Sequence, residues 1–182
     1  MLPGEIVIAE SRKSIYGAMN DGIAASKGRY LYFVGKDDIV LPTFKIALDA
    51  VVGRAPSAVF FDVYWGSKGV YSGRPSRWLV LGRNVCHQGI LYSRETVLRH
   101  GPYVRKMRVQ ADHLLNIRLL WDSRLRNSIV YVASPLAWYS GDGFSTTSRD
   151  KVFWRLYPLV MRRYVGWSAA CALVLYRKLR GR

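Results

Sequence analysis

Residues 14–38 read SIYGAMNDGIAASKGRYLYFVGKDD, and this pattern predicts a helix that leads into a buried strand. The helix spans 14–27, with a serine as its N-terminal cap, apolar side chains on one face and a glycine after its last turn. The strand at 29–34 is apolar almost throughout, which is typical of a strand covered on both faces. Asp37 and Asp38 follow it directly, so we expect them at the carboxyl end of a sheet strand, where α/β domains bind ligands.

Strand and helix patterns alternate along the rest of the chain. Further strands are predicted at 5–10, 57–64, 86–92 and 128–133, further helices at 42–53, 109–121 and 151–179, and loops at 66–82 and 135–148. This alternation predicts an α/β fold, with a mostly parallel sheet flanked by helices. We therefore expect an α/β domain at residues 1–148 and a basic helical tail at 149–182, with a kink at Pro158.

The composition is that of a folded, basic domain. Half of the 182 residues are apolar, which excludes a disordered tail or a low-complexity linker. Lys and Arg outnumber Asp and Glu by 28 to 12, and this excess favours polyanionic partners. Nucleic acid is not expected among them, because the chain has no helix-turn-helix, RNP or zinc-finger signature. The two isolated cysteines form neither a disulfide framework nor a zinc site.

The tail at 149–182 carries half of the net charge of +16, with nine basic residues and one acid. Its apolar residues recur at helical spacing beside Trp154 and Trp167, a pattern that favours contact with an anionic membrane surface. A helix packed on the domain, with a solvated basic face, is the alternative that the pattern leaves open. The apolar run at 164–176 is too short to cross a bilayer, because a span needs roughly 20 residues.

Three acids are candidates for chemistry. Asp37 and Asp38 would repel each other without a cation, and Mg²⁺ typically bridges one or two carboxylates to phosphate oxygens. A solvated turn is the alternative for this pair. Asp112 opens an apolar helix, where it could act as a general base or serve only as a favourable first-turn acid. His87 and His113 are interpreted as structural residues unless a ligand lies beside them.

Five segments, in this order, resemble the family 2 glycosyltransferases, which have the GT-A fold. They are similar to the family segments GIYDAMNKGIxxAxGxY, FLxxDD, CHQxxFY, ADxDxxxR and GGxS, and lie at residues 14–28, 32–38, 86–92, 111–116 and 142–145. The subgroup that they resemble builds bacterial cell-surface polysaccharide and glycolipid. The resemblance implies an α/β fold of the GT-A (Rossmann-like) type over residues 5–148.

The resemblance also implies roles for individual residues. Asp38 becomes the metal ligand for Mn²⁺ or Mg²⁺, Asp37 its neighbour beside the sugar nucleotide, and Asp112 the catalytic base. The matching strand and loop segments imply four residues that bind substrate: His87, Gln88, Gly143 and Ser145. The implied reaction is an inverting glycosyl transfer, in which the cation stabilises the leaving diphosphate and the base takes the acceptor proton.

The implied partners follow from that reaction. The donor is a nucleotide sugar, and the acceptor is a hydroxyl of a glycan or lipid-linked molecule in cell-envelope polysaccharide biosynthesis. With the basic tail on an anionic membrane, the expected location is cytoplasmic and peripheral, on the inner face of the cell membrane.

The chain also departs from the family pattern. Lys36 precedes the acid pair, Leu114 stands where a further acid is expected, Asp142 replaces a glycine, and residues 11–13 replace an acidic approach to the first helix. Nothing before residue 5 resembles the two N-terminal βα units that hold the nucleotide base and ribose. We therefore expect an incomplete GT-A fold that alone binds a nucleotide sugar poorly or not at all. The alternative function is a non-catalytic module that binds a membrane surface or a partner protein.

Overall fold

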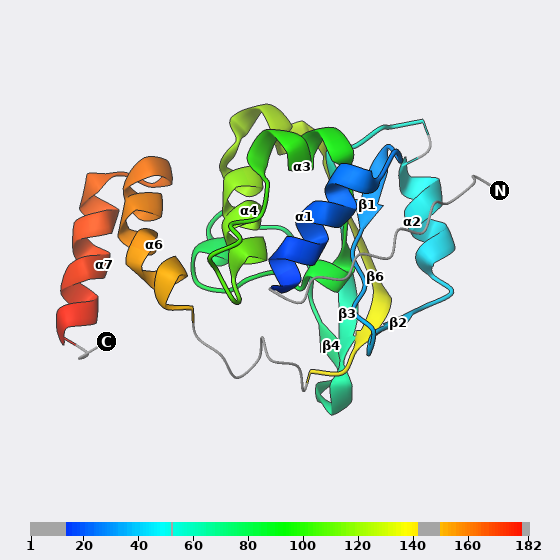
Figure 1. Cartoon of the computed structure of the whole chain (residues 1–182), viewed down its shortest axis with the longest axis horizontal. Helices are drawn as coiled ribbons and strands as arrows, with labels where there is room; N and C mark the ends of the chain where they lie inside the picture. The colour runs from blue at the N-terminus through cyan, green and yellow to red at the C-terminus, as the bar shows by residue number, and fades with distance from the viewer. Residues whose placement is uncertain (1–13, 52, 142–149, 180–182) are drawn as a thin grey trace.

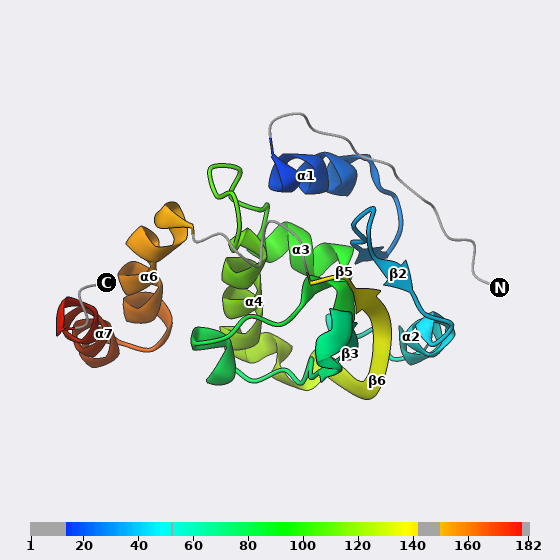
Figure 2. The ribbon, with the colours of Figure 1, turned by 90° about the horizontal axis from the view of Figure 1, so that it is seen from below.

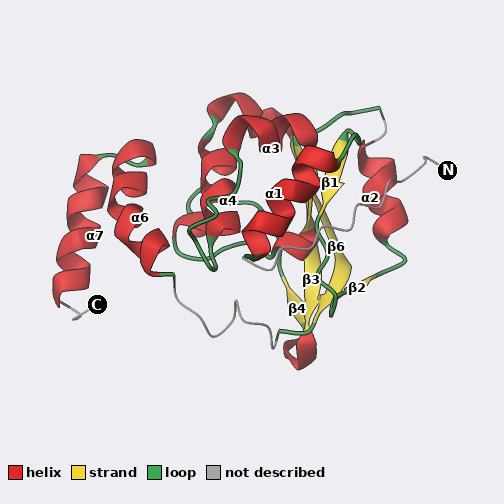
Figure 3. Ribbon diagram, in the orientation of Figure 1, coloured by secondary structure: helices red, strands yellow, loops and turns green. Residues whose placement is uncertain are grey.

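The computed structural model of the chain describes residues 14–51, 53–141 and 150–179. It has a mixed α/β architecture in which helices lie on both faces of one curled sheet (Figure 1, Figure 3). The strand expected at 5–10 lies outside the described residues.

The helices and strands alternate much as the sequence predicts. The helices are α1 (Ile15–Ala25), α2 (Phe44–Val51), α3 (Arg94–His100), α4 (Ala111–Trp121), α6 (Lys151–Tyr164) and α7 (Trp167–Leu179). The strands are β1 (Tyr30–Tyr32), β2 (Ile39–Val40), β3 (Ala58–Trp65), β4 (Val70–Tyr71), β5 (Ile90–Ser93) and β6 (Ile129–Tyr139). Short 3₁₀ turns lie at Gly66–Lys68, Leu79–Leu81, His87–Gly89 and Ser123–Ser128.

The sheet has the strand order β1-β5-β3-β6-β2, with β4 added beside β3. Among the described strands only β3 and β6 run parallel, and the other four pairs are antiparallel. The α/β class is thus confirmed, whereas the expectation of a mostly parallel sheet is wrong for the described strands. The chain between β3 and β6 contains α3 and α4, which supply the helical crossover that a parallel pair needs. The connection between β3 and β5 holds only β4 and 3₁₀ turns, so these strands pair antiparallel.

Alternating side chains of β3 fill two cores. Ala58 and Phe60 face the larger core beneath α1, α3 and α4, whereas Val59 and Phe61 face a smaller core beneath α2. All four side chains are fully buried. This period-2 alternation explains why the strand reads as a continuous apolar run, since both faces of the sheet are covered (Figure 2).

Several boundaries differ from the sequence-based expectation. Ser14 caps α1 as expected, because its Oγ accepts a hydrogen bond of 2.9 Å from the N–H of Gly17. The strand expected at 86–92 begins only at Ile90, because the residues before it form a 3₁₀ turn. Strand β6 runs on to Tyr139, into the predicted loop, and Pro135 is accommodated where the register with β3 shifts.

The C-terminal segment forms two helices rather than one kinked helix. Helix α6 continues through Pro158, and the break comes at Gly166, whose φ of +119° favours glycine. Phe153 and Tyr157 of α6 are buried in the larger core, and the Phe153 ring stacks on His113 with centroids 5.0 Å apart. One face of α6 is therefore packed on the domain, as in the alternative that the sequence left open. No helix within the described residues has the length and apolar character needed to span a membrane.

Candidate functional site

The 3₁₀ turn at His87–Gly89 connects the residues that the sequence singled out. Gln88 is buried, and its side-chain N–H donates a hydrogen bond of 2.8 Å to Oδ2 of Asp38. Its Oε1 accepts a 2.8 Å contact from the Cys86 thiol, and its backbone carbonyl accepts a 2.8 Å hydrogen bond from the Tyr32 hydroxyl. These contacts fix the Gln88 amide with its N–H group toward the acid.

Asp38 closes a tight turn just after β1. Its Oδ2 also accepts a hydrogen bond of 2.8 Å from the backbone N–H of Gly35. A Cβ at Gly35 would lie 2.8 Å from the same oxygen, so the turn requires glycine or a displaced carboxylate. Both hydrogen bonds end on Oδ2, which leaves Oδ1 as the oxygen that could take a cation. The neighbouring Asp37 is exposed.

Asp112 lies in the first turn of α4 and is 8% exposed. Its Oδ1 accepts a hydrogen bond of 2.6 Å from the Tyr16 hydroxyl, and its Oδ2 accepts one of 2.5 Å from the Asn84 amide. Nδ1 of His87 lies 4.0 Å from the same Oδ2. Two neutral donors thus hold the carboxylate in place, and a half-buried imidazole lies beside it.

The donors of Asp112 belong to a longer buried network. Oδ1 of the Asn84 side chain accepts a 2.9 Å hydrogen bond from the Asn116 amide, and Oδ1 of Asn116 accepts one of 2.8 Å from the Tyr92 hydroxyl. The Tyr16 ring stacks on Tyr103 with centroids 5.4 Å apart. Burial raises the pKa of Tyr16, and the charge of Asp112 raises it further, so the phenol remains a neutral donor. The network thus connects Asp112 to α1 through Tyr16, and to β5 through Asn84, Asn116 and Tyr92.

Adjacent residues of one turn therefore connect the two candidate acids. Gln88 bonds Asp38, while His87 lies beside Asp112. Gly89 permits this arrangement, because a Cβ there would lie 2.5 Å from the Phe61 carbonyl oxygen. Gly143 and Ser145 lie outside the described residues, so their predicted roles rest on the sequence alone.

Sequence reasoning missed three of the residues in this network. Tyr16 lies within the quoted helix, but nothing in its spacing indicates that it reaches a residue in α4. Asn84 and Asn116 have no sequence signal, because an asparagine in a loop or in a helix is common without any partner acid. His113 is structural, as interpreted from the sequence. Its Nε2 lies 2.5 Å from the Val80 carbonyl oxygen, and burial lowers its pKa.

The donor set fits a cation only when a ligand completes it. The described residues hold no group of three or more His, Cys, Asp or Glu side chains that could bind a metal ion. Mg²⁺ commonly takes one or two carboxylates and obtains its other oxygens from phosphate and water. Asp38 and the exposed Asp37 match that minimal set, so a cation here would be shared with a bound diphosphate.

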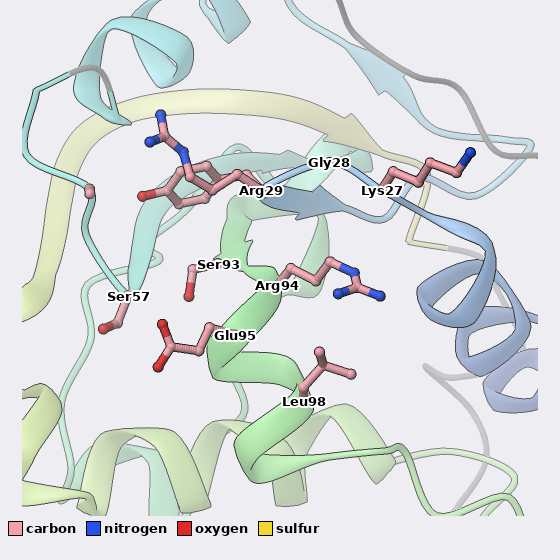
Figure 4. Close-up of a pocket in the computed structure, with 10 residues that line it drawn as sticks. Lys27, Gly28, Arg29, Ser57, Ser93, Arg94, Glu95 and Leu98 are labelled. Carbon is pink, nitrogen blue, oxygen red and sulfur yellow. The ribbon is translucent and has the colours of Figure 1, made fainter.

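A separate basic pocket of about 490 Å³ lies at the other end of strands β1, β3 and β5 from the candidate acids (Figure 4). It is lined by residues at the start of β1 and β3 and the end of β5, among them Arg29, Ser57 and Arg94. Asp38 instead follows the end of β1, and Gln88 precedes β5. No acid of the candidate site lines this pocket, so the chemistry predicted from the sequence does not belong there.

The chain is similar in sequence to mycobacterial proteins. It is 32% identical over 168 residues to a PGL/p-HBAD biosynthesis glycosyltransferase of Mycobacterium bovis, and equally to one of Mycobacterium tuberculosis. The matches cover 86% of this chain and 63% of each relative, so the chain spans less than two thirds of their length. No protein-family model matches the chain.

The fold is similar to that of S. aureus TarS. A crystal structure of TarS 1–349 gives a TM-score of 0.61 at 10% identity, over 83% of this chain and 46% of that one. TarS 1–349 in complex with UDP-GlcNAc gives a TM-score of 0.57 at 11% identity, over 84% and 48% of the two chains. At this identity the likeness concerns the fold, which is of the GT-A type.

Proposed function

We propose, from the premise that the chain is a family 2-like glycosyltransferase domain of the GT-A type, that it transfers a sugar from a nucleotide-sugar donor to a hydroxyl of a glycan or glycolipid acceptor. The mycobacterial relatives are named for PGL/p-HBAD biosynthesis, and one TarS structure holds UDP-GlcNAc. The complex supports a nucleotide-sugar donor, and the name of the relatives supports an acceptor of the cell-surface glycolipid type.

One observation carries the proposal: two acids with different surroundings are held on either side of a single turn. Asp38 is half-buried and has an exposed acid beside it, which suits a cation bound to a diphosphate. Asp112 is almost fully buried and is fixed by the Tyr16 and Asn84 side chains. A donor at the first acid and an acceptor at the second would meet across His87 and Gln88.

Asp112 acts in this proposal as the general base. The acceptor oxygen forms a bond to the anomeric carbon while the bond from that carbon to the donor phosphate breaks. The acceptor proton goes to Asp112, and the nucleoside diphosphate leaves with the electron pair. Attack from the face opposite the leaving group inverts the anomeric centre. Tyr16 and Asn84 keep the carboxylate oriented for this transfer, since a base must lie within hydrogen-bond reach of the proton.

Asp38 and Asp37 would hold Mn²⁺ or Mg²⁺ against the donor diphosphate, and the cation would supply charge stabilisation for the leaving group. Gln88 keeps Oδ2 of Asp38 occupied by a hydrogen bond and so orients Oδ1. The role of Gln88 is therefore to position the metal ligand. His87 is half-buried and lies beside Asp112, where it could donate a hydrogen bond to an oxygen of the nucleotide sugar or of the acceptor molecule.

We also propose that the C-terminal helices bring the domain to the cytoplasmic face of an anionic membrane. Trp167 is 65% exposed and Leu159 is 59% exposed, so apolar side chains remain at the surface after α6 has packed on the domain. The Arg162 guanidinium lies 4.0 Å from the centre of the Trp167 ring. Exposed tryptophan beside arginine is typical of residues at a membrane interface.

Saturation-transfer NMR tests the donor site and detects weak binding. UDP-, GDP- and dTDP-sugars are added at millimolar concentration, with Mg²⁺ as the cation. Signal from one donor class, lost in Asp38→Ala and retained in Asp49→Ala, is expected; Asp49 is a matched exposed acid in α2, with Lys45 at 3.4 Å. Equal signal in both variants would contradict the proposed donor site, and no signal from any donor would contradict donor binding by this chain on its own.

A further inference from the structure

The segment at 66–84, which lies outside the tail, carries only basic charges. It contains Lys68, Arg74, Arg77 and Arg83 and no acid. Its 3₁₀ turn at Leu79–Leu81 lies against α4 and next to α6 (Figures 1 and 2). The turn is fastened from both sides, because the Val80 carbonyl contacts His113 and the Leu81 carbonyl accepts a hydrogen bond from the Tyr157 hydroxyl.

Three consecutive residues of this segment, Arg77, Trp78 and Leu79, form an exposed ridge, named here the Arg–Trp ridge. Trp78 is 57% exposed and Leu79 is 62% exposed, although the adjacent Val80 is fully buried. Large apolar side chains that remain at the surface together are typical of an interaction site. Within the described part of the domain, more than half of the surface of each of these two residues stays uncovered.

The ridge is held in a fixed shape by its own contacts. The Trp78 ring meets Trp121 edge to face with centroids 5.1 Å apart. The Arg77 guanidinium lies 5.1 Å from the Trp78 ring and 5.5 Å from the Trp121 ring, and the Trp121 indole N–H donates to the Arg77 carbonyl at 2.7 Å. An aromatic side chain fixed in this way loses little conformational entropy on binding.

The charge of the segment selects the occupant. An apolar tip with Arg77 packed on its tryptophan, in a segment that has four basic residues and no acid, is complementary to an anionic lipid surface, where tryptophan occupies the headgroup region and basic residues contact phosphates. A neutral glycan would not require the exposed Leu79 or the uncompensated positive charge. The tail has the same construction in Arg162 and Trp167, and Tyr157 joins the two elements.

We infer that the Arg–Trp ridge inserts into the headgroup region of an anionic phospholipid membrane, as a second contact beside the C-terminal helices. This inference rests on the membrane association in the proposed function and extends it to the catalytic domain itself. Trp121 ends α4 and Asp112 lies in its first turn, nine residues earlier, which is about 14 Å at 1.5 Å per residue. The ridge would therefore hold the candidate base close to the surface from which a lipid-linked acceptor projects.

An environment-sensitive fluorophore on Leu79→Cys, in a Cys171→Ser background, tests the insertion. Ile46→Cys in α2 is the matched control, because Ile46 is an aliphatic residue that is 45% exposed and lies on the other face of the sheet. Vesicles of phosphatidylcholine alone are compared with vesicles that contain phosphatidylglycerol. The expected result is a blue shift at position 79, and none at 46, only with the anionic vesicles. Arg74→Gln should weaken vesicle binding about five-fold, the effect of one basic residue near an anionic surface.

Three results would overturn the inference. The protein could sediment with anionic vesicles without a shift at position 79, in which case the tail alone makes the contact. It could fail to sediment at all, which would also remove the membrane part of the proposed function. A soluble oligosaccharide could shift the label at 79 without vesicles, which would make the ridge a glycan site. Donor NMR without vesicles, on the same labelled protein, separates each of these from failure of the transferase proposal.

Discussion

Tyr16→Phe removes one oxygen atom and with it the hydrogen bond of 2.6 Å to Oδ1 of Asp112. Both residues are less than 10% exposed, so water cannot readily replace the lost donor. A hydrogen bond to a charged group contributes about 1.5–3 kcal/mol, and we expect the free energy of unfolding to fall by about 2 kcal/mol. In a chain of this length that corresponds to about 4–8 °C in Tm.

Urea unfolding followed by circular dichroism measures this change, provided that the slope with denaturant is unaltered. Tyr64→Phe is the matched control, because Tyr64 is a tyrosine of β3 that is 41% exposed. The free energy of unfolding of this variant should differ from that of the unmodified protein by less than about 0.5 kcal/mol. In the transfer reaction, Tyr16→Phe should also lower kcat more than it changes the KM of the donor, since the base loses its orientation. A loss of stability equal to that of the control would refute the role assigned to the bond.

Further predictions concern the turn, the base, the cap of α6 and the two thiols. Gly89→Ala should lower both stability and donor binding, because its Cβ would meet the Phe61 carbonyl oxygen at 2.5 Å, whereas Gly82→Ala, whose nearest contact is at 3.9 Å, should change neither; thermal melts and donor NMR compare them. Asp112→Asn should abolish transfer and retain donor binding, and a radiolabelled-sugar transfer assay that found unchanged turnover would exclude Asp112 as the base. Asp150→Ala should cost about 3 kcal/mol, because its carboxylate accepts hydrogen bonds from the N–H groups of Val152, Phe153, Arg108 and Val109; urea unfolding measures this loss, and a cost below about 1 kcal/mol would contradict it. Burial raises the pKa of the Cys86 thiol to about 12, so iodoacetamide at pH 8 should label the exposed Cys171 and leave Cys86 protonated and unlabelled. The reactivity of Cys86, and any loss of stability from its ionisation, should appear only as the pH rises between about 9 and 12. Mass spectrometry of the labelled peptides measures this, and equal labelling of both thiols at pH 8 would contradict it.

Local patterns predicted most of the elements correctly. The serine cap and apolar face of α1, the apolar run of β3 and the helix that Asp112 opens were all expected, because each depends on side chains within a few residues of one another. The sequence predicted a kink at Pro158, but α6 accommodates this proline and the chain leaves the helical conformation only near Gly166, whose φ is positive.

Strand direction could not be predicted from those patterns. An apolar run such as that of β5 indicates burial on both faces but does not indicate orientation, and antiparallel strands buried on both sides look the same in sequence. The same limit explains the missed network. Tyr16 and Asp112 are 96 positions apart, and only the packing of α1 on α4 brings the hydroxyl to the carboxylate.

The candidate site was predicted in part. The resemblance indicated Asp38, His87, Gln88 and Asp112, and the structure brings these four side chains to one turn. Their roles in binding and transfer stay predictions, as does the metal. The donors that hold Asp112 had to come from the structure, because asparagine and tyrosine in these positions have no pattern of their own.

Paramagnetic relaxation of the amide signals by Mn²⁺ bound with a nucleotide sugar tests the account most directly. A single site between the two acids predicts broadening first at residues 35–38, then at His87, Gln88 and Asp112, with Asp38→Ala abolishing all of it. Two results would contradict the account. One is broadening centred on Arg29 and Arg94, in the pocket at the other end of these strands. The other is an unchanged Asp112 signal beside a broadened Asp38 signal.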